Sequence, residues 1–415
     1  MASPLASYLM RRAVGNRHGV VMAPQRAPVS QADVASIVHF GVPRVADAPW
    51  QSACGGVGRD VDSAWSAAVG EAIERTAAGL VRLPTRRRGE LPDDARIDAD
   101  EFALYTPGQR ADPAFPFGPL YDDDCPYAEV FPLDGGEPRW APQPLVSLQD
   151  PHHTGVSTSS GLAAGASPRE ALLSGLQEVI ERDALMVTWL HGLTGRGVRP
   201  LPRHESEVAR LGGAAATFDL TPAYSPFPVA AVMGGIRTRG RWRYSLGVAC
   251  RDTWEAAAEK AYLEWNQGVL FAGVYPRYVD AASLPGADDL VSFDEHAVYY
   301  TAHSDEWEPL PLWRGRSSVG EPSETGEERG VDGALAVASD RLRAAGIRVF
   351  ARDLTTIDAV QAGLHVVRVL SPDLAPIFAH QRWPSLNRVG GMLASRYPDR
   401  VGESRFPFLA PHPLG

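Results

Sequence analysis

Apolar residues recur at the three- and four-residue spacing of a helix in three segments of the chain, 60–79, 167–192 and 252–268. Each segment begins with an aspartate or a serine, which can accept a hydrogen bond from the first helical turn. In the clearest case Ser167 is followed by Pro168 and Glu170, the arrangement of a capping box. A glycine stands where each predicted helix would end, at Gly79, Gly192 and Gly268.

Shorter apolar runs predict strands between and after these helices. The expected strands lie at 129–133, 143–148, 227–238, 242–250 and 363–372, and 227–238 and 242–250 should pair as a hairpin. The segment 334–355 is typical of a helix followed by a strand, and 315–333 is polar, rich in glycine and expected to be a flexible exposed loop. This mixture predicts an α/β or α+β fold.

The composition narrows the class of protein. Of the 415 residues 44% are hydrophobic and 22% are charged, which is ordinary for a soluble protein with a full core. The formal net charge of −10 argues against nucleic-acid binding, which needs clustered Lys and Arg. No apolar stretch is long enough to span a bilayer, so no membrane partner is expected. Three scattered cysteines without a C-x-x-C pair favour a reduced, cytoplasmic protein.

The pattern E-x-x-E-R occurs twice, once in each of the first two predicted helices. The third predicted helix carries a lysine, a glutamate and a glutamine at similar spacing. Side chains three or four positions apart share one face of a helix. Each set is therefore either a solvent-exposed stripe of an amphipathic helix or a group directed at a ligand. The residues are Glu71, Glu74, Arg75, Glu178, Glu181, Arg182, Lys260, Glu264 and Gln267.

Small residues surround the first and third of these sets. They are Ala64, Ala67, Gly70 and Ala78 beside the first and Ala256, Ala257 and Ala261 beside the third. Solvent faces usually carry long polar side chains, so these faces favour carboxylates that point inward, where they need partners or a metal ion. Carboxylates suit Mg²⁺, and Arg and Lys suit phosphate oxygens. No P-loop or dinucleotide fingerprint is present, so a magnesium–phosphate site of another kind and the surface interpretation are both open.

Four segments, in order, resemble the signature segments of the YcaO family. The first three are "GGVGRDVDSAWSAAVGEAIER", "STSSGLAAGASPREALLSGLQEVIERDA" and "AAAEKAYLEWNQ". The fourth, "LRAAGIRVFARDLTTIDAVQAGLHVVRVLSPDL", is similar to the C-terminal region of that family. The resemblance runs from about residue 50 to the end of the chain, and it implies a catalytic domain at 51–415 with residues 1–50 packed on it.

The resemblance implies a YcaO-type ATP-binding fold with mixed sheets and three helices that converge on a Mg²⁺-ATP site. Proteins of this family phosphorylate the oxygen of a peptide backbone amide, which a nucleophile then attacks. Carried over to this sequence, the metal ligands are Glu71, Glu74, Glu178, Glu181 and Glu264. The nucleotide-binding residues are Arg75, Ser159, Ser160, Gly161, Arg182, Lys260 and Gln267.

Several positions depart from the family pattern. Ala67 stands where the family has serine, Val57 where it has lysine, and Ser160 where it has asparagine. Lys260 stands where arginine is frequent, which keeps the charge but loses the bidentate geometry. These departures put individual nucleotide contacts in question while the glutamates are intact.

The chain ends in "FPFLAPHPLG", which is similar to the P-x-P-x-P tail of azoline-forming members of the family. Pro411 and Pro413 match that tail and are assigned a catalytic role, while Gly415 replaces a third proline. The match implies cyclodehydration of Cys, Ser or Thr in a ribosomally made precursor peptide to thiazoline or (methyl)oxazoline. Such azole-modified peptides belong to natural-product and antibiotic biosynthesis.

The expected partners are the precursor peptide and a separate leader-binding protein of the E1-like (ocin-ThiF) type, because no E1-like extension precedes the resemblance. A homodimer is also allowed for. Two other activities are open within the family, namely thioamide formation with sulfide and macroamidine formation with an internal amine. A non-catalytic scaffold that binds the precursor or a partner enzyme is the alternative of another class, and the departures at Ala67, Val57 and Ser160 favour it.

Overall fold

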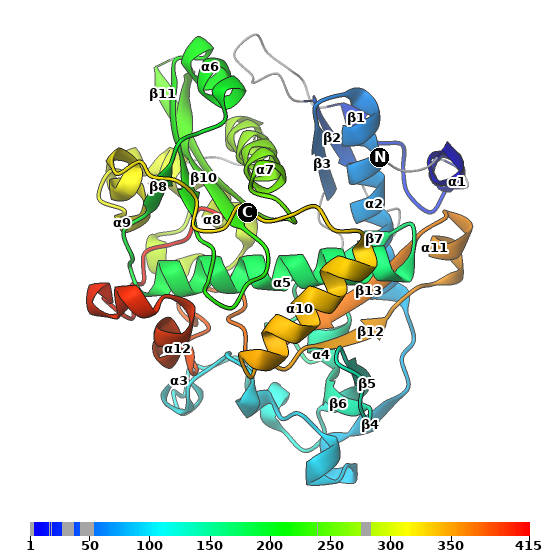
Figure 1. Ribbon diagram of the computed structural model, residues 1–415. Coiled ribbons are helices and arrows are strands. Elements are labelled where there is room, and N and C mark those ends of the chain that lie inside the picture. Colours follow the sequence, from blue (N-terminus) through cyan, green and yellow to red (C-terminus); the bar gives the residue numbers. More distant parts are fainter. Residues whose placement is uncertain are drawn as a thin grey trace. The chain divides into compact units, whose positions relative to one another are not determined.

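The computed structural model describes residues 4–15, 17, 19–26, 37–41, 54–238, 240–274 and 284–415. The described residues fall into two compact units. Unit 1 lies within Met1–Pro28, Ile37–Val179 and Gly330–Leu374, and unit 2 lies within Ile180–Arg329 and Ala375–Gly415. Helix α5 (Pro168–Leu190) begins in unit 1 and ends in unit 2 (Figure 1). Of the predicted N-terminal segment, 1–3, 16, 18, 27–36 and 42–50 lie outside the described residues.

A three-stranded antiparallel sheet in unit 1 supports the first carboxylate helix. Its strands are β1 (Gln25–Arg26), β2 (Ile37–Gly41) and β3 (Cys54–Gly58), and α2 (Val61–Leu80) packs against it (Figure 1). A Cβ on Gly56 would lie 2.2 Å from the Ala68 nitrogen, so only glycine lets β3 approach α2 this closely. Helix α1 (Pro4–Ala13) contacts α2 through an ion pair between Arg11 and Asp62.

The larger sheet of unit 1 has the strand order β4-β5-β12-β13-β7, with β6 paired to β5, and every pairing is antiparallel. The strands are β4 (Thr85–Arg87), β5 (Pro126–Pro132), β6 (Arg139–Pro142), β7 (Leu162–Gly165), β12 (Phe350–Asp353) and β13 (His365–Leu370). They confirm the strands predicted at 129–133, in 334–355 and at 363–372. The other helices are α3 (Pro107–Arg110), α4 (Gln143–Val146), α10 (Val331–Ala344) and α11 (Ile357–Gln361), with 3₁₀ turns at Arg88–Glu90, Asp93–Ala95, Ala99–Glu101 and Gly118–Tyr121.

The strand predicted at 143–148 is wrong, because this segment forms the single helical turn α4. Pro144 occupies the first turn of that helix, where a missing backbone N–H costs nothing, and the Ser147 N–H donates to the Gln143 carbonyl. A short apolar run does not by itself distinguish a strand from a buried helical turn.

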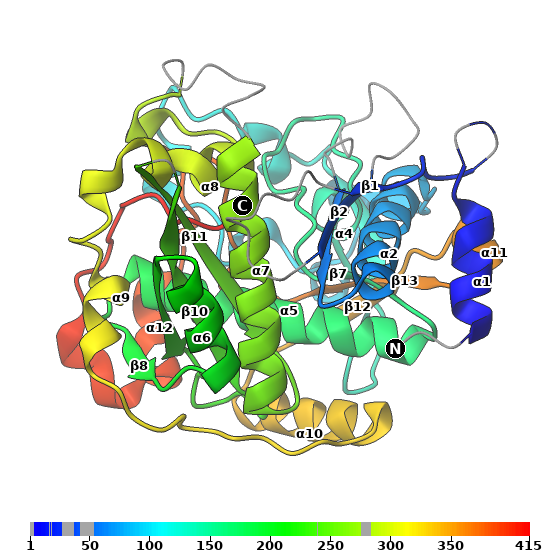
Figure 2. The same cartoon turned by 90° about the horizontal axis from the view of Figure 1, so that it is seen from above.

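Unit 2 is built on a four-stranded antiparallel sheet of order β11-β10-β9-β8. Its strands are β8 (Arg196–Val198), β9 (Gly213–Asp219), β10 (Val229–Thr238) and β11 (Arg241–Cys250), and the register Val229↔Cys250 confirms the predicted hairpin. Helix α7 (Trp254–Val274) lies along β10 and β11 (Figure 2) and buries Tyr262 and Trp265 in the core between them. The remaining helices are α6 (Pro202–Arg210), α8 (Phe293–Ala302), α9 (Pro311–Arg314) and α12 (Val389–Arg396), with 3₁₀ turns at Ala287–Asp289, Ser304–Glu306, Gly315–Ser317 and Pro398–Glu403.

The predicted caps of two helices are confirmed. Asp60 accepts a hydrogen bond from the Ser63 N–H at 2.8 Å at the start of α2, although α2 ends at Leu80, one residue past Gly79. Ser167 accepts from the Glu170 N–H at 3.2 Å at the start of α5. Beyond the last turn of α5, Gly192 has a φ of 59°, a left-handed conformation that suits glycine at a helix end.

The predicted end of the third helix is wrong, because α7 continues past Gly268 to Val274. A Cβ on Gly268 would lie 2.0 Å from the Ser245 hydroxyl oxygen, so this glycine serves close packing of α7 on β11. The apolar residues that follow it, among them Val269 and Leu270, are buried and hold the last turns in place. The helix also starts at Trp254, so its N-cap is Thr253 and not the predicted Asp252.

The segment predicted as a loop at 315–333 is largely exposed, but backbone contacts within unit 2 hold it. Gly320 bridges to Val198 of β8, and the Trp254 N–H donates to the Thr325 carbonyl at 2.8 Å. Helix α10 begins at its far end. Mixed helices and antiparallel sheets make the architecture α+β, as predicted. In the described part of the chain no helix is both long and apolar enough to cross a membrane.

Candidate functional site

The first predicted metal ligand, Glu71, is held in place from two sides. Its Oε2 accepts a hydrogen bond from the Gly55 N–H of β3 at 2.8 Å, and its Oε1 lies 2.6 Å from the Arg75 guanidinium one turn further along α2. The side chains of Glu71 and Arg75 are 27% and 21% exposed, so this pair is not a solvent-exposed salt bridge. The half-buried setting disfavours the surface interpretation of this stripe.

Glu74 lies close to two other predicted metal ligands. Burial, followed by the negative charges of Glu178 and Glu71, raises the pKa of Glu74 to about 8. Arg75 and Arg368 lower it, but they do not offset these effects. Glu71, Glu74 and Glu178 of unit 1 therefore lie within electrostatic range of one another, and a cation placed among them would favour the ionised form of Glu74. We refer to these three residues as the carboxylate cluster.

Arg368 of β13 is not among the residues predicted from the sequence. Its side chain is buried, and its guanidinium donates to the carbonyl oxygens of Val146, Thr158 and Ser160. Two of these carbonyls belong to the segment that precedes the predicted nucleotide residue Gly161. A single arginine inside the apolar run "GLHVVRVLSP" was the signal, since a buried strand rarely carries an isolated charge.

The segment Ser159–Gly161 takes its backbone shape from β13. Gly161 has a φ of 78°, its carbonyl accepts from the Val369 N–H at 2.7 Å, and a Cβ there would lie 2.1 Å from the Val369 carbonyl oxygen. Glycine is therefore required at this position by packing. Ser159 and Ser160 are half-buried, so their side chains keep some access to a ligand.

The predicted residues of unit 2 have a different electrostatic setting. Glu181 is 4% exposed, pairs with the Arg182 guanidinium and accepts from the Cys250 N–H at 3.3 Å. On α7 the Lys260 ammonium lies 3.2 Å from Glu264. Each of these carboxylates is therefore in contact with a cation of its own. Gln267, one turn further along α7, is half-buried.

The C-terminal tail is bound to unit 2 through its carbonyl groups. The carbonyls of four consecutive residues, 409–412, each face one side-chain donor from elsewhere in the unit. Gln381 donates to Leu409, Trp189 to Ala410 and Tyr300 to Pro411, and His296 Nδ1 lies 3.1 Å from the His412 carbonyl. Residues 411–414, which include the predicted catalytic residues Pro411 and Pro413, are buried.

The tail also lies within electrostatic reach of a predicted nucleotide residue. His412 is buried and stacks on His296, with ring centroids 4.1 Å apart. Burial, then the charge of His296 and in smaller measure that of Arg182, holds the pKa of His412 well below its ordinary value of 6.5. The imidazole of the tail is therefore neutral at neutral pH.

None of the cysteines is a plausible nucleophile. Cys54, Cys125 and Cys250 are buried thiols, and burial raises the pKa of Cys54 and Cys125 to about 12. Among the described residues, no three His, Cys, Asp or Glu side chains form a group that could hold a metal ion alone. A bound ion would thus take part of its coordination from a ligand or from water.

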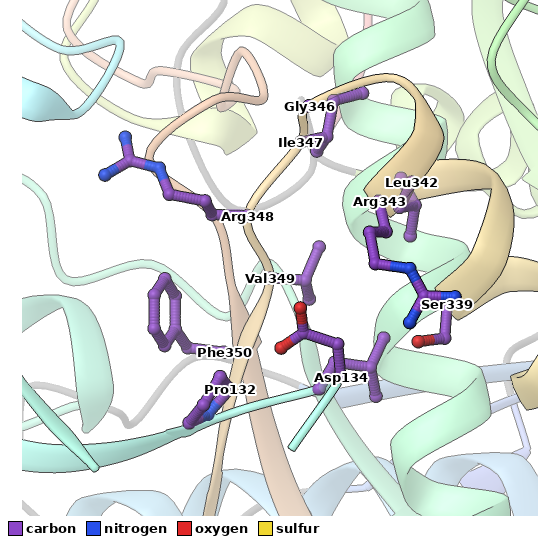
Figure 3. Close-up of a pocket in the computed structure, with 11 residues that line it drawn as sticks. Pro132, Asp134, Ser339, Leu342, Arg343, Gly346, Ile347, Arg348, Val349 and Phe350 are labelled. Carbon is purple, nitrogen blue, oxygen red and sulfur yellow. The ribbon is translucent and has the colours of Figure 1, made fainter. Parts of the chain in front are cut away.

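A small pocket in unit 1 lies between α10, β12 and the end of β5 (Figure 3). Its volume is about 180 Å³, and its lining includes Asp134, Arg343 and Arg348 but none of the predicted site residues. Pockets for drug-sized ligands have volumes of roughly 300–1,000 Å³, so this one is too small for a nucleotide. We do not assign it to the candidate site.

A family model covers most of the sequence. The model described as YcaO cyclodehydratase, ATP- and Mg²⁺-binding, matches residues 55–375. The chain belongs to the YcaO family. The predicted family is confirmed, and so are the predicted cofactors, ATP and Mg²⁺.

Solved structures of YcaO proteins share the fold. A heterocyclase in complex with substrate and cofactor matches 97% of this chain and 55% of its own, with a TM-score of 0.76 and 18% identity. YcaO from Methanopyrus kandleri bound with AMPPCP and Mg²⁺ matches 89% of this chain and 88% of its own, with a TM-score of 0.63 and 19% identity. A chain of the E. coli microcin synthetase McbBCD complex matches 87% of this chain and 90% of its own, with a TM-score of 0.61 and 16% identity.

The chain spans about half the length of two of these relatives, the heterocyclase with substrate and the heterocyclase TruD, of which it covers 55% and 48%. It spans most of the archaeal and microcin synthetase chains. A search of curated proteins finds no match. At identities below 20% these structures establish the YcaO fold.

The residues of unit 1 fit the Mg²⁺ and phosphate that a YcaO protein binds. Mg²⁺ takes one or two carboxylates together with phosphate oxygens and water, and the carboxylate cluster offers carboxylates within electrostatic range of one another. A Cβ on Gly70, one turn before Glu74 on α2, would meet no atom within 4 Å, and Ala67 is exposed. This side of α2 thus has room for a ligand, including at the position where the family has serine.

Proposed function

We propose that this chain is an ATP-dependent cyclodehydratase that converts Cys, Ser or Thr of a ribosomally made precursor peptide to thiazoline or (methyl)oxazoline. The observation that carries the proposal is the carboxylate cluster, in which burial and then the charges of Glu178 and Glu71 raise the pKa of Glu74, and in which Gly55 and Arg75 hold Glu71. Such a cluster gains free energy when it binds a divalent cation, and proteins of the YcaO family bind Mg²⁺ and ATP.

The predicted site residues have the following proposed roles. Glu71, Glu74 and Glu178 bind Mg²⁺, and the resemblance assigns Glu181 and Glu264 to the same task. Arg75, Arg182 and Lys260 bind phosphate oxygens, and Ser159, Ser160, Gly161 and Gln267 bind the nucleotide. Bound Mg²⁺-ATP supplies the phosphoryl group and the positive charge that stabilises its transfer.

The chemistry of the peptide follows from this arrangement. The side-chain heteroatom of the substrate loses its proton and adds to the preceding carbonyl carbon, while the amide oxygen accepts the phosphoryl group. Phosphate then leaves with that oxygen, the amide nitrogen loses its proton, and the C=N bond of the azoline forms. The protein excludes water and holds the peptide, and the tail with Pro411 and Pro413 is proposed to position it.

A separate protein is proposed to bring the precursor. This chain covers 55% and 48% of two relatives named heterocyclases, and another relative is named as part of the McbBCD complex. These lengths and the named complex support an arrangement in which a protein or domain beyond the region matched here binds the leader peptide. The peptide products would belong to azole-modified natural products, including antibiotics.

Mass spectrometry tests the proposal directly. The purified chain, given Mg²⁺-ATP, a precursor peptide from a neighbouring gene and its leader-binding partner, should remove one water per modified residue and release phosphate. Exchange of oxygen for sulfur in the presence of sulfide would instead indicate a thioamide, and loss of water with closure onto an amine would indicate a macroamidine. ATP turnover in none of these assays would favour the non-catalytic scaffold.

A further inference from the structure

Arg368 occupies a central strand and has an unusual set of partners. On β13 it lies opposite Arg352 of β12 and Leu162 of β7, and 2% of its surface is exposed. Nε donates to the Val146 carbonyl at 3.2 Å, Nη2 to the Thr158 carbonyl at 2.7 Å, and Nη1 to the Ser160 carbonyl. In the described part of the chain, every hydrogen bond of the Arg368 guanidinium is to a backbone carbonyl oxygen.

Arg396 of unit 2 shows what a structural buried arginine looks like in this protein. It is 6% exposed and donates to Asp183 from Nε at 3.2 Å and from Nη2 at 3.4 Å, and Asp183 itself is fully buried. A full negative charge in contact therefore balances Arg396. Carbonyl oxygens carry only partial charges, so the hydrogen bonds of Arg368 leave its charge to be balanced from further away.

Glu178 and Glu74 of the carboxylate cluster interact electrostatically with Arg368. Burial lowers the pKa of Arg368 to about 10, and Glu178 and then Glu74 raise it. The interaction is mutual, since Arg368 is among the charges that lower the pKa of Glu74. Arg368 thus touches the backbone of the segment before Gly161 and acts electrostatically on two of the proposed metal ligands.

We propose that Arg368 is a positioning residue of the Mg²⁺-ATP site, which fixes the backbone of Thr158–Ser160 by hydrogen bonds and offsets the charge of Glu74 and Glu178. The part of this inference that concerns ATP rests on the proposed function. The hydrogen bonds require the planar fork of the guanidinium, whereas the electrostatic effect requires only a positive charge. The two parts can therefore be separated by substitution.

Hydrogen exchange tests the first part without any ligand. In Arg368→Lys the ammonium cannot serve three diverging carbonyls, so amide exchange in residues 156–162 should rise about tenfold, the effect of losing hydrogen bonds to a charged group. Arg396→Lys is the matched control and should leave this segment unchanged. Unchanged exchange in Arg368→Lys, or an equal rise throughout unit 1, would overturn the positioning role.

Calorimetry with Mg²⁺ and a non-hydrolysable ATP analogue tests the second part. Arg368→Gln should weaken binding about tenfold, and Arg368→Lys should lose less because it keeps the charge. Equal affinity in both variants and the wild type would overturn the electrostatic role. If the wild type itself does not bind the analogue, the proposed function fails, while the exchange experiment still decides the positioning role.

A double substitution covers the case in which Arg368→Gln folds poorly. If Arg368 offsets Glu178, the drop in unfolding temperature caused by Arg368→Gln should be smaller in a Glu178→Gln background. The drop caused by Arg396→Gln should be the same in both backgrounds. Additive effects of Arg368→Gln and Glu178→Gln would contradict an electrostatic link between these residues.

Discussion

The carboxylates of unit 1 and unit 2 come from the same kind of sequence but differ in charge balance. In unit 2 each predicted ligand touches its own cation, Glu181 with Arg182 and Glu264 with Lys260. In unit 1 Arg75 pairs with Glu71, and burial together with the charges of Glu178 and Glu71 outweighs Arg75 and Arg368 and raises the pKa of Glu74 to about 8. Helical spacing therefore brings carboxylates together without determining whether they repel each other or pair with cations.

This difference predicts that Mg²⁺ affects the carboxylates of the two units differently. Carboxylates that raise each other's pKa gain free energy when Mg²⁺ binds, because the ion relieves their repulsion. A carboxylate that is already paired gains less from the ion, but the arginine or lysine of the pair can turn to a phosphate. On this argument Mg²⁺ should stabilise the carboxylate cluster of unit 1 more than the ion pairs of unit 2.

The largest effect is expected from removing one charge of the carboxylate cluster. Glu178→Gln and Glu74→Gln should each lower ATP turnover by about 100-fold or more, since a ligand of the charge-stabilising ion is lost. In Mg²⁺-free buffer at neutral pH both variants should unfold at a temperature equal to or above that of the wild type. Glu178→Gln removes a charge that repels Glu74, and Glu74→Gln removes a carboxyl that must take up a proton on folding. Turnover assays and calorimetric unfolding scans measure the two effects.

Glu137→Gln is a suitable control, because Glu137 is an exposed residue of unit 1. It should change neither turnover nor unfolding temperature. Full activity of Glu178→Gln would show that Glu178 belongs to the polar face of an ordinary amphipathic helix and does not bind the metal. A sharp fall in unfolding temperature for Glu74→Gln would contradict the repulsion on which the comparison of the two units rests.

A smaller effect is expected on the paired side of the comparison. Glu264→Gln should lower turnover about tenfold, and its unfolding temperature should not rise, because a half-buried ion pair is lost and no repulsion is relieved. Glu255→Gln, on the exposed first turn of the same helix, is the matched control. A loss of activity as large as that of Glu74→Gln would show that the two units do not differ in their dependence on charge.

The tail of unit 2 should show a further, weaker dependence. Tyr300→Phe removes the donor to the Pro411 carbonyl and should reduce kcat for peptide modification severalfold, up to about tenfold, while ATP binding stays unchanged. Tyr299→Phe controls for it, because the neighbouring hydroxyl donates to Glu306 and does not touch the tail. Equal kcat in both variants would show that the tail has a structural role only.

Local signals account for what could be predicted from the sequence. Asp60 and Ser167 cap their helices as predicted because a cap depends on residues three positions away, and the hairpin 227–250 follows from apolar strands that are adjacent in the chain. The E-x-x-E-R repeats are also local, because residues three or four positions apart share one face of α2 or α5. Their side chains are half-buried or buried.

Long-range contacts account for what could not be predicted. Gly268 is typical of a helix end, but it lies inside α7, where close packing on Ser245 of β11 requires glycine. Arg368 bonds carbonyls 208 to 222 positions away in the sequence, and the four donors to the tail come from α5, α8 and the segment around Gln381. No pattern within a few residues carries such information.

The smallest effect concerns Lys260, the only lysine in a chain with 39 arginines. Lys260→Arg keeps the charge beside Glu264 and should change the KM for ATP by less than about threefold, whereas Lys260→Gln should raise it about tenfold.

A single lysine also allows a direct measurement on the wild type. Reductive ¹³C-methylation labels only Lys260 and the terminal amine, and the Lys260 methyl resonance should shift when Mg²⁺-ATP is added. If Lys260 turns to phosphate, Mg²⁺ alone should leave that resonance in place, because the ammonium then responds to the phosphate and not to the metal. A shift with Mg²⁺ alone, or none with Mg²⁺-ATP, would contradict phosphate binding by Lys260.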